Sequence, residues 1–419
     1  MERGFVYMRM FHIIFLLTSF FLTTGCWDKT ELEELAEVIV IGIDQAENGY
    51  INITYKVANP EVGTSAKAGG NEEEPAQTFS LTATDFFSAK DIANSFITRK
   101  MTYNHVRTLI VSEDFSRSDE FLKFAYTMTR DRELRRDTWL IISKESAKEF
   151  IQNNKPKFET RPHKYYQFMM QRSMETGLVP PSSLHRFLQV MEGGEDLFLA
   201  PYVTTKKENK KKDGNEDEFL AGQVPKEGGD IAQVIGSAVI KKGKVIGTLT
   251  GEETRLAILL DNTLETEEML VTYPDPLHPK YRIAARLLKK QSTDIKMKLD
   301  SETPEIEVHV PITLEVIAIP SMEDYVEDIK KQQLLKDSLE TGMKDKMLRI
   351  INKSQTEFEA CPFYWSMVAR KQFLTNQEYK KFDWKSQYPK ARIDVSVSIQ
   401  LNEFGLKLRT TENKNYKDE

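Results

Sequence analysis

The pattern of apolar and polar residues predicts strands and helices in mixed order through the first half of the chain. Asp28 and Glu31 have capping-box spacing, which predicts a short helix over 30–36. Glu47-Asn48-Gly49 predicts a hairpin turn between the first two strands. β-Branched and aromatic runs predict strands at 38–43, 50–57, 78–82, 106–111 and 138–143. Helical periodicity predicts helices at 85–99 and 119–128, and several between 147 and 190.

The second half shows the same mixture and ends in a long amphipathic helix and a strand. Residues 241–244 separate two apolar runs and predict another hairpin. Further elements are expected as a helix at 252–259 and strands at 269–272, 294–299, 305–317 and 394–401. A long helix from Met322 carries an apolar stripe that reads as core: Leu335, Leu339, Met343, Met347 and Ile351. Mixed runs of helices and strands favour the α+β class over a doubly wound sheet.

The predicted elements and the distribution of charge divide the chain into segments. We expect a multi-domain α+β protein, with three domains, behind an N-terminal leader. Lys, Glu, Asn and Gly gather at 206–229, where Pro201-Tyr202 closes the helical region, and predict a solvated linker. The predicted segments are a leader at 1–25, an α+β domain at 26–145, a mainly helical region at 146–205, the linker at 206–229, an α+β domain at 230–405 and a tail at 406–419.

The N-terminus has the order of a bacterial lipoprotein signal peptide. Arg3 and Arg9 precede an apolar run at 10–22, and the small residues at 23–25 lead directly to Cys26. The apolar run is shorter than the ~20 residues that a membrane-spanning helix needs, which disfavours a retained transmembrane anchor. The cysteine after Gly25 resembles the lipobox, in which the thiol accepts a diacylglycerol and cleavage makes the cysteine residue one. We therefore predict lipidation at Cys26.

Composition adds limits on function. The 419 residues are 40% hydrophobic and 29% charged, enough for globular cores. The formal net charge of −6 becomes −7 without residues 1–25, whose own net charge is +1, and an acidic exported chain is a poor nucleic-acid binder. With Cys26 lipidated, Cys361 has no partner for an intramolecular disulfide, and we expect it to be a small buried apolar residue.

Standard catalytic motifs are missing from the sequence. It contains no G-x-S-x-G elbow and no H-E-x-x-H pair, and the glycines of 236–245 lack phosphate-loop spacing. The six histidines occur singly, so no metal site is predicted. We predict no catalytic residue, no metal and no cofactor.

One charged cluster, Arg130-Asp131-Arg132-Glu133-Leu134-Arg135-Arg136-Asp137, stands between a predicted helix and strand. Alternating signs are typical of a solvated, salt-bridged corner. A docking surface for a partner is the alternative, with Arg130, Arg132, Arg135 and Arg136 as its candidate contacts. Trp27, beside the lipidated cysteine, is a further candidate, since indole rings favour the headgroup level of membranes.

Blocks along the chain resemble the C-subunits of spore germinant receptors, the Ger(x)C lipoproteins. The first block is Gly25-Cys26-Trp27-Asp28, and the resemblance extends in order over nearly the whole chain. Its further blocks are Glu31-Leu32, Ile41-Gly42-Ile43-Asp44, His105 with Leu109-Ile110-Val111 and Glu113, Arg130 to Arg135, Gly236 to Ile240, Lys244 to Gly247, Trp384, Tyr388 to Ala391, and Asp394 to Val397.

This resemblance implies a non-enzymatic lipoprotein on the outer face of the spore's inner membrane. It implies assembly with a membrane-spanning A-subunit and a transporter-like B-subunit that senses small nutrients. Whether this chain itself touches the small molecule stays open, and so do the germinant and the contact residues. The main alternative is a solute-binding lipoprotein of a transporter, which usually has two α/β lobes around a hinge.

Overall fold

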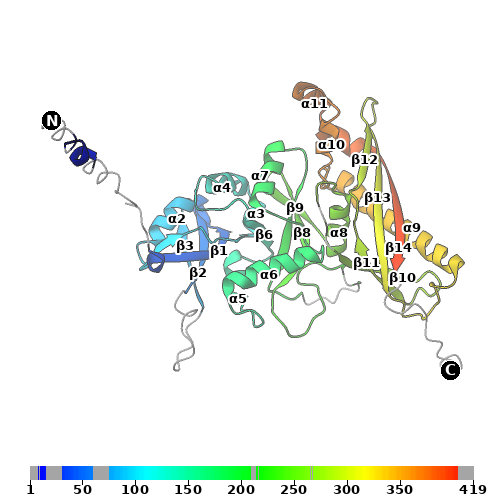
Figure 1. The fold of residues 1–419 in the computed structure, drawn as a ribbon, viewed down its shortest axis with the longest axis horizontal. Helices are drawn as coiled ribbons and strands as arrows, with labels where there is room; N and C mark the ends of the chain where they lie inside the picture. The colour runs from blue at the N-terminus through cyan, green and yellow to red at the C-terminus, as the bar shows by residue number, and fades with distance from the viewer. Residues whose placement is uncertain are drawn as a thin grey trace.

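The computed structural model describes residues 8, 10–15, 31–59, 75–208, 214–215, 217–264, 266 and 268–403. Within them the chain forms two β-sheets covered by helices, so the predicted α+β class is confirmed. The first sheet carries the N-terminal end of the fold, and the second lies at the opposite end of the molecule (Figure 1). In this part of the chain, no helix has the length and apolar character needed to cross a bilayer.

The first sheet mixes parallel and antiparallel pairs. Four strands at its centre, β1, β5, β6 and β7, run parallel to one another. They are almost entirely buried, as expected for parallel strands covered by helices on both faces. In spatial order the strands are β3 (Ala76–Ala83), β2 (Ile51–Ala58), β1 (Leu35–Gln45), β5 (Thr108–Ser112), β6 (Trp139–Ser143), β7 (Phe198–Thr204), β8 (Gln233–Lys241) and β9 (Lys244–Leu249), and β4 (Lys100–Thr102) pairs with the start of β1.

Helices cover both faces of this sheet because successive strand residues point to opposite sides. Leu109 and Val111 of β5 join one core, whereas Ile110 between them joins the other. The first core is closed by α2 (Phe86–Ala93), α3 (Glu113–Ser116), α4 (Glu120–Met128) and α7 (Leu184–Gly193). The second is closed by α5 (Ala147–Asn153) and α6 (Pro162–Glu175).

The second sheet is built around one long strand, β13 (Glu305–Ala318). β14 (Arg392–Glu403) runs parallel along one edge of it, and β12 (Asp294–Lys298) and β11 (Arg282–Leu288) share the other edge. The sheet also contains β10 (Met269–Pro274), and the helices of this half are α9 (Ile329–Thr356), α10 (Ser366–Arg370), α11 (Asn376–Phe382) and α12 (Trp384–Gln387). The predicted stripe of α9, from Leu335 to Ile351, is buried against this sheet as expected.

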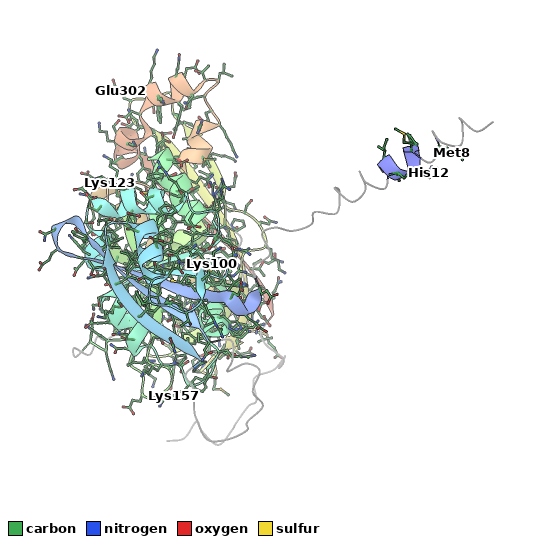
Figure 2. All side chains as sticks on the ribbon, turned by 90° about the vertical axis from the view of Figure 1, so that its left-hand side faces the viewer. Met8, His12, Lys100, Lys123, Lys157 and Glu302 are labelled. Atoms are coloured by element: carbon green, nitrogen blue, oxygen red, sulfur yellow. The ribbon has the colours of Figure 1, made fainter. Side chains whose placement is uncertain are left out.

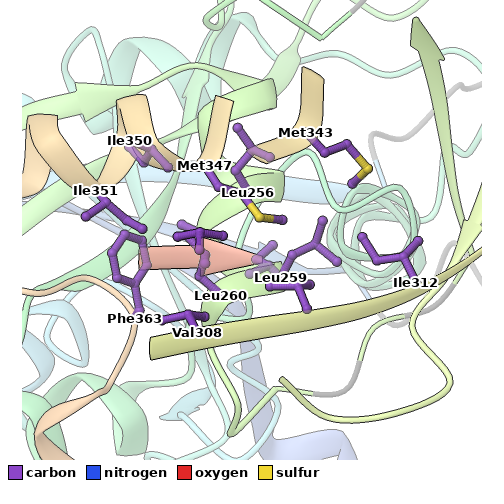
Figure 3. Close-up of a cluster of buried hydrophobic side chains, with 14 of the residues drawn as sticks. Leu256, Leu259, Leu260, Val308, Ile312, Met343, Met347, Ile350, Ile351 and Phe363 are labelled. Carbon is purple, nitrogen blue, oxygen red and sulfur yellow. The ribbon is translucent and has the colours of Figure 1, made fainter. Parts of the chain in front are cut away.

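A single short helix, α8 (Gly251–Leu260), lies between the two sheets. Its residues Leu256 to Leu260 are buried around the whole helix, which is the pattern of a helix enclosed on all sides. Figure 3 shows Leu256 and Leu259 beside Met343 of α9 and Ile312 of β13. The same core includes Val239 and Leu249 of the first sheet, so the two sheets share one hydrophobic core.

Some sequence predictions are wrong at element boundaries. The expected helix at 30–36 is only one 3₁₀ turn, Leu32–Glu34, because the chain from Leu35 pairs with β4. The long helix begins at Ile329 rather than Met322, where the Asp328 carboxylate caps its first free N–H groups.

The helical region does not end at Pro201-Tyr202. These residues belong to β7, a buried interior strand with no polar alternation, and β11 was not predicted either. The segment 206–229 connects β7 and β8, which pair in the same sheet, and the second sheet begins only with β10. The division into three domains stays a prediction.

The junction of the two sheets contains an unusual buried carboxylate. Asp196, just before β7, pairs with Cys361 in a short β-bridge, and the Leu197 N–H donates to the Cys361 carbonyl at 2.8 Å. Cys361 is fully buried, as predicted. The Ser366 hydroxyl donates to Oδ2 of Asp196, but Oδ1 has no hydrogen-bond partner among the described residues. Burial raises the pKa of Asp196 to about 7.

We predict that Asp196→Asn removes a pH-dependent loss of stability. Between pH 4 and 7 the unfolded chain ionises Asp196 while the folded protein keeps it protonated, so unfolding becomes easier as pH rises. Relative to the variant, the wild-type free energy of unfolding should fall by up to about 4 kcal/mol over this range. Denaturant unfolding at several pH values measures the difference.

Asp119 supplies the control, because its hydrogen bond from Lys244 lowers its pKa. Asp119→Asn should therefore show a dependence of opposite sign. A difference between wild type and Asp196→Asn that does not change with pH would contradict the prediction.

Candidate docking surface at the amino-terminal edge of the first sheet

Three segments of the chain meet at one edge of the first sheet. Because β1, β5 and β6 are parallel, the residues that precede each of them lie at the same end of the sheet. Backbone hydrogen bonds tie them together: the Arg107 N–H donates to the Ile39 carbonyl, and the Trp139 N–H donates to the Arg107 carbonyl at 2.9 Å. We call this the amino-terminal edge, formed by residues 31–34, 103–107 and 130–137.

The predicted arginine cluster forms the loop at 130–137 between α4 and β6. Buried Leu134 fixes the loop to the core. The Glu133 carboxylate accepts from Lys90 Nζ of α2 at 2.7 Å and from the Tyr103 N–H at 2.8 Å. Burial raises the pKa of Glu133, but these hydrogen bonds outweigh it and lower the pKa overall. The carboxylate therefore stays ionised and joins three segments.

The loop leaves part of its positive charge unpaired. Asp137 is occupied by Arg135 at 2.8 Å and Arg107 at 3.0 Å, and the hydrogen bond from Arg135 lowers the pKa of Asp137. A second set of guanidinium groups is solvent-exposed and pairs with no carboxylate among the described residues: Arg130, Arg132 and Arg136. These groups are free to bind anionic groups of a partner.

Some of the predicted site residues lie outside the described residues, and the others lie together on the amino-terminal edge. Cys26 and Trp27 lie outside the described residues, as does the predicted cleavage site. Arg130, Arg132, Arg135 and Arg136 all lie on the amino-terminal edge, in the loop that contacts Tyr103 and Arg107 ahead of β5. Sequence reasoning did not foresee this, because it did not predict that β1, β5 and β6 are parallel neighbours.

The helix predicted at 85–99 is shorter than expected at this end of the sheet. The helix α2 ends at Ala93, and Ile92 and Phe96 are 45% and 57% exposed. Among the described residues, no group of three His, Cys, Asp or Glu side chains has an arrangement that could hold a metal ion.

The class of protein is defined by its similarity to known proteins. A model of the spore germination protein N-terminal domain matches residues 28–205, and a model of the spore germination B3/GerAC-like C-terminal domain matches residues 235–405. The two matches identify a protein of spore germination. The chain belongs to the GerAC-like family, as the sequence blocks indicated, and this is a family of germinant receptor subunits rather than a known enzyme family.

Full-length relatives are similar over nearly all of the chain. The putative spore germination protein YfkR of Bacillus subtilis (strain 168) is 20% identical, covering 93% of this chain and 95% of its own. Spore germination proteins KC and B3 of the same strain are 23% and 21% identical, covering 94% and 91% of this chain and 95% and 94% of their own.

A solved structure supports the fold. The crystal structure of the GerBC protein matches with a TM-score of 0.53 and 16% identity, covering 86% of this chain and 96% of that chain. At this identity the likeness establishes the fold alone. The role in spore germination follows from the family, and germinant receptor membership points to association with a membrane.

We predict that Glu133→Ala destabilises the protein by about 1–3 kcal/mol, because it leaves the partly buried Lys90 ammonium and the Tyr103 N–H without their acceptor. Urea unfolding provides the measurement. Glu120→Ala is the matched control: its carboxylate pairs with Lys123 at 2.7 Å on an exposed helix face, where we expect about 0–0.5 kcal/mol. Equal losses in the two variants would mean that Glu133 does not hold the edge together.

Proposed function

We propose that this protein is the lipid-anchored C-subunit of a nutrient germinant receptor, acting with membrane-spanning A- and B-subunits. The observation that carries the proposal is the order of the chain: Cys26 in a lipobox-like site, followed at once by the two spore germination domains at 28–205 and 235–405. The protein then lies on the outer face of the spore's inner membrane.

The proposed role is assembly rather than catalysis. Ligand binding in the complex shifts a conformational equilibrium, and contacts that differ between the two states allow the C-subunit to bias it. A diacylglycerol on Cys26 supplies two acyl chains, which is sufficient for stable anchoring. Confinement to the membrane keeps the folded domains close to their partners at high effective concentration.

The amino-terminal edge is the proposed contact with the other subunits. Arg130, Arg132 and Arg136 are exposed and pair with no carboxylate in the described part of the chain, and Arg135 shares Asp137 with Arg107, so the edge suits acidic groups on a partner. Trp27 is the proposed contact at the headgroup level.

A solute-binding lipoprotein of a transporter remains the alternative function. Such proteins close two lobes about a hinge. In this protein the described parts of the two sheets share one core around α8 and α9 instead of forming two separate lobes. This arrangement favours the receptor-subunit function over the solute-binding function.

We predict that Cys26→Ala leaves the fold intact but lowers the germination response to single nutrients by about tenfold or more, because the lost anchor removes the high effective concentration. The loss of optical density of variant spores measures the response, and immunoblots of spore membranes check the amount of protein. A normal response in a strain without paralogous receptors would show that protein contacts alone suffice.

We predict that replacing Arg130, Arg132 and Arg136 together by Glu weakens germination about fivefold or more, since the reversed charges repel an acidic partner surface. The control reverses three exposed lysines of the α10–α11 region, Lys371, Lys380 and Lys381, which carry the same charge far from the edge. Equal effects of the two triple variants would assign the loss to net charge instead of to this surface.

A further inference from the structure

An apolar patch is left uncovered where α2 ends. α2 buries Phe86, Ala89 and Ala93, but Ile92 and Phe96 face away from the core and are 45% and 57% exposed. The Phe96 ring has one aromatic neighbour among the described residues, the Phe79 ring, in a T-shaped contact at a centroid distance of 5.4 Å. We call Ile92, Phe96 and the exposed Lys100 that follows them the α2-end patch.

The α2-end patch is held rigidly beside the first residues of β1. The Asn94 side-chain oxygen accepts from the Met101 N–H at 2.9 Å, which fixes the turn after α2. Lys100 then pairs with Leu35 in the parallel bridge between β4 and β1. Figure 2 looks onto this end of the molecule and labels Lys100. The patch therefore lies where the chain enters the first sheet.

The length of chain before β1 limits how far this end can move from the membrane. Glu31 follows Cys26 by five positions. A fully extended chain gains at most ~3.6 Å per residue, so these residues span at most about 18 Å. If Cys26 carries the proposed lipid, the α2-end patch stays close to the headgroups.

We propose that the α2-end patch is a second membrane contact, in which Ile92 and Phe96 insert at the boundary between headgroups and acyl chains and Lys100 binds an anionic headgroup. Apolar side chains flanked by a basic residue are the chemistry that membrane surfaces bind. Glu33, Glu34 and Asp91 are also exposed near this end, so the apolar insertion, and not a net positive field, carries the contact.

A second contact has a structural consequence. One flexible tether leaves a domain free to turn about its anchor, whereas a tether and an inserted patch together fix which side faces the bilayer. The loop at 130–137, on the same edge, is then held near the membrane surface for contact with membrane-spanning partners. This inference rests on the proposed lipid anchor.

The test compares two exposed positions in the full lipidated protein. Phe96→Cys and, as a matched control, Leu374→Cys are labelled with an environment-sensitive dye; Leu374 is 96% exposed and lies between α10 and α11, away from α2. Buried Cys361 supplies the unlabelled background. Each protein is reconstituted into vesicles of equal parts phosphatidylcholine and phosphatidylglycerol, and quenching by aqueous iodide is measured.

We expect iodide to quench the dye at position 96 at least about threefold less than at position 374, because the patch is inserted. Equal quenching at the two positions would overturn the proposal. Shielding of position 96 that appears only after adding the membrane-spanning subunits would assign the patch to protein contact and overturn the lipid assignment. Failure of the unsubstituted protein to attach to vesicles would instead count against the lipid anchor itself.

A second measurement removes the anchor. In a Cys26→Ala chain, the pair Ile92→Asp and Phe96→Asp should weaken binding to the same vesicles about tenfold, while Leu374→Asp leaves it unchanged. Both sets alter exposed side chains, and thermal unfolding checks that the fold is retained. Equal vesicle binding by the two variants would also overturn the proposal.

Discussion

The enclosure of α8 between the two sheets is the constraint on which the rest of the structure depends. The second half of α8, Leu256 to Leu260, is apolar on every side, and such a segment is stable only when protein surrounds it. Leu256, Leu259 and Leu260 of α8 pack in the same cluster as the second sheet and α9, together with Val239 and Leu249 of the first sheet. Separating the sheets would expose this helix to water, so the burial of α8 holds the two sheets together.

Charged residues around α8 restrict the junction further. Its first turn carries the half-buried Glu252 and Glu253, which pair with Lys346 and Lys353 of α9, the latter pair at 2.8 Å. Arg255 of α8 is about nine-tenths buried. It donates to Asp217 and to the Thr176 carbonyl, and removing one partner of such a pair leaves a charge uncompensated. Ion pairs and hydrogen bonds depend on direction, so these contacts restrict the junction to one geometry. Apolar packing alone would tolerate several geometries.

The sequence predicted most elements well where their pattern was local. The hairpin of β1 and β2, the helix α4 and the buried stripe of α9 follow from turn residues and helical periodicity, and all three are confirmed. β7 was missed because it is an interior strand buried at every position, and short sequence windows do not separate such a run from a buried helix. The exposure of apolar residues at the end of α2 was not predicted either. Sequence alone does not distinguish an apolar residue that packs in a core from one that lies on a docking surface.

Several blocks of the family resemblance turn out to hold the fold together. A Cβ at Gly42 would lie 2.6 Å from Ile151 of α5, so the glycine lets that helix approach β1. Asp44 accepts from the Ala147 and Lys148 N–H groups at the start of α5. Packing and capping explain both positions.

The block at 130–135 has two parts: Glu133 and Leu134 hold the loop to the fold, whereas exposed Arg130 and Arg132 pair with no carboxylate among the described residues. An exposed guanidinium contributes little to stability. Two candidate surfaces are therefore groups that the fold leaves exposed: the arginines of the amino-terminal edge that pair with no carboxylate among the described residues, and the apolar side chains of the α2-end patch. Because α8 joins the two sheets in one core, any partner that binds this edge also sets the position of the second sheet at the far end of the molecule.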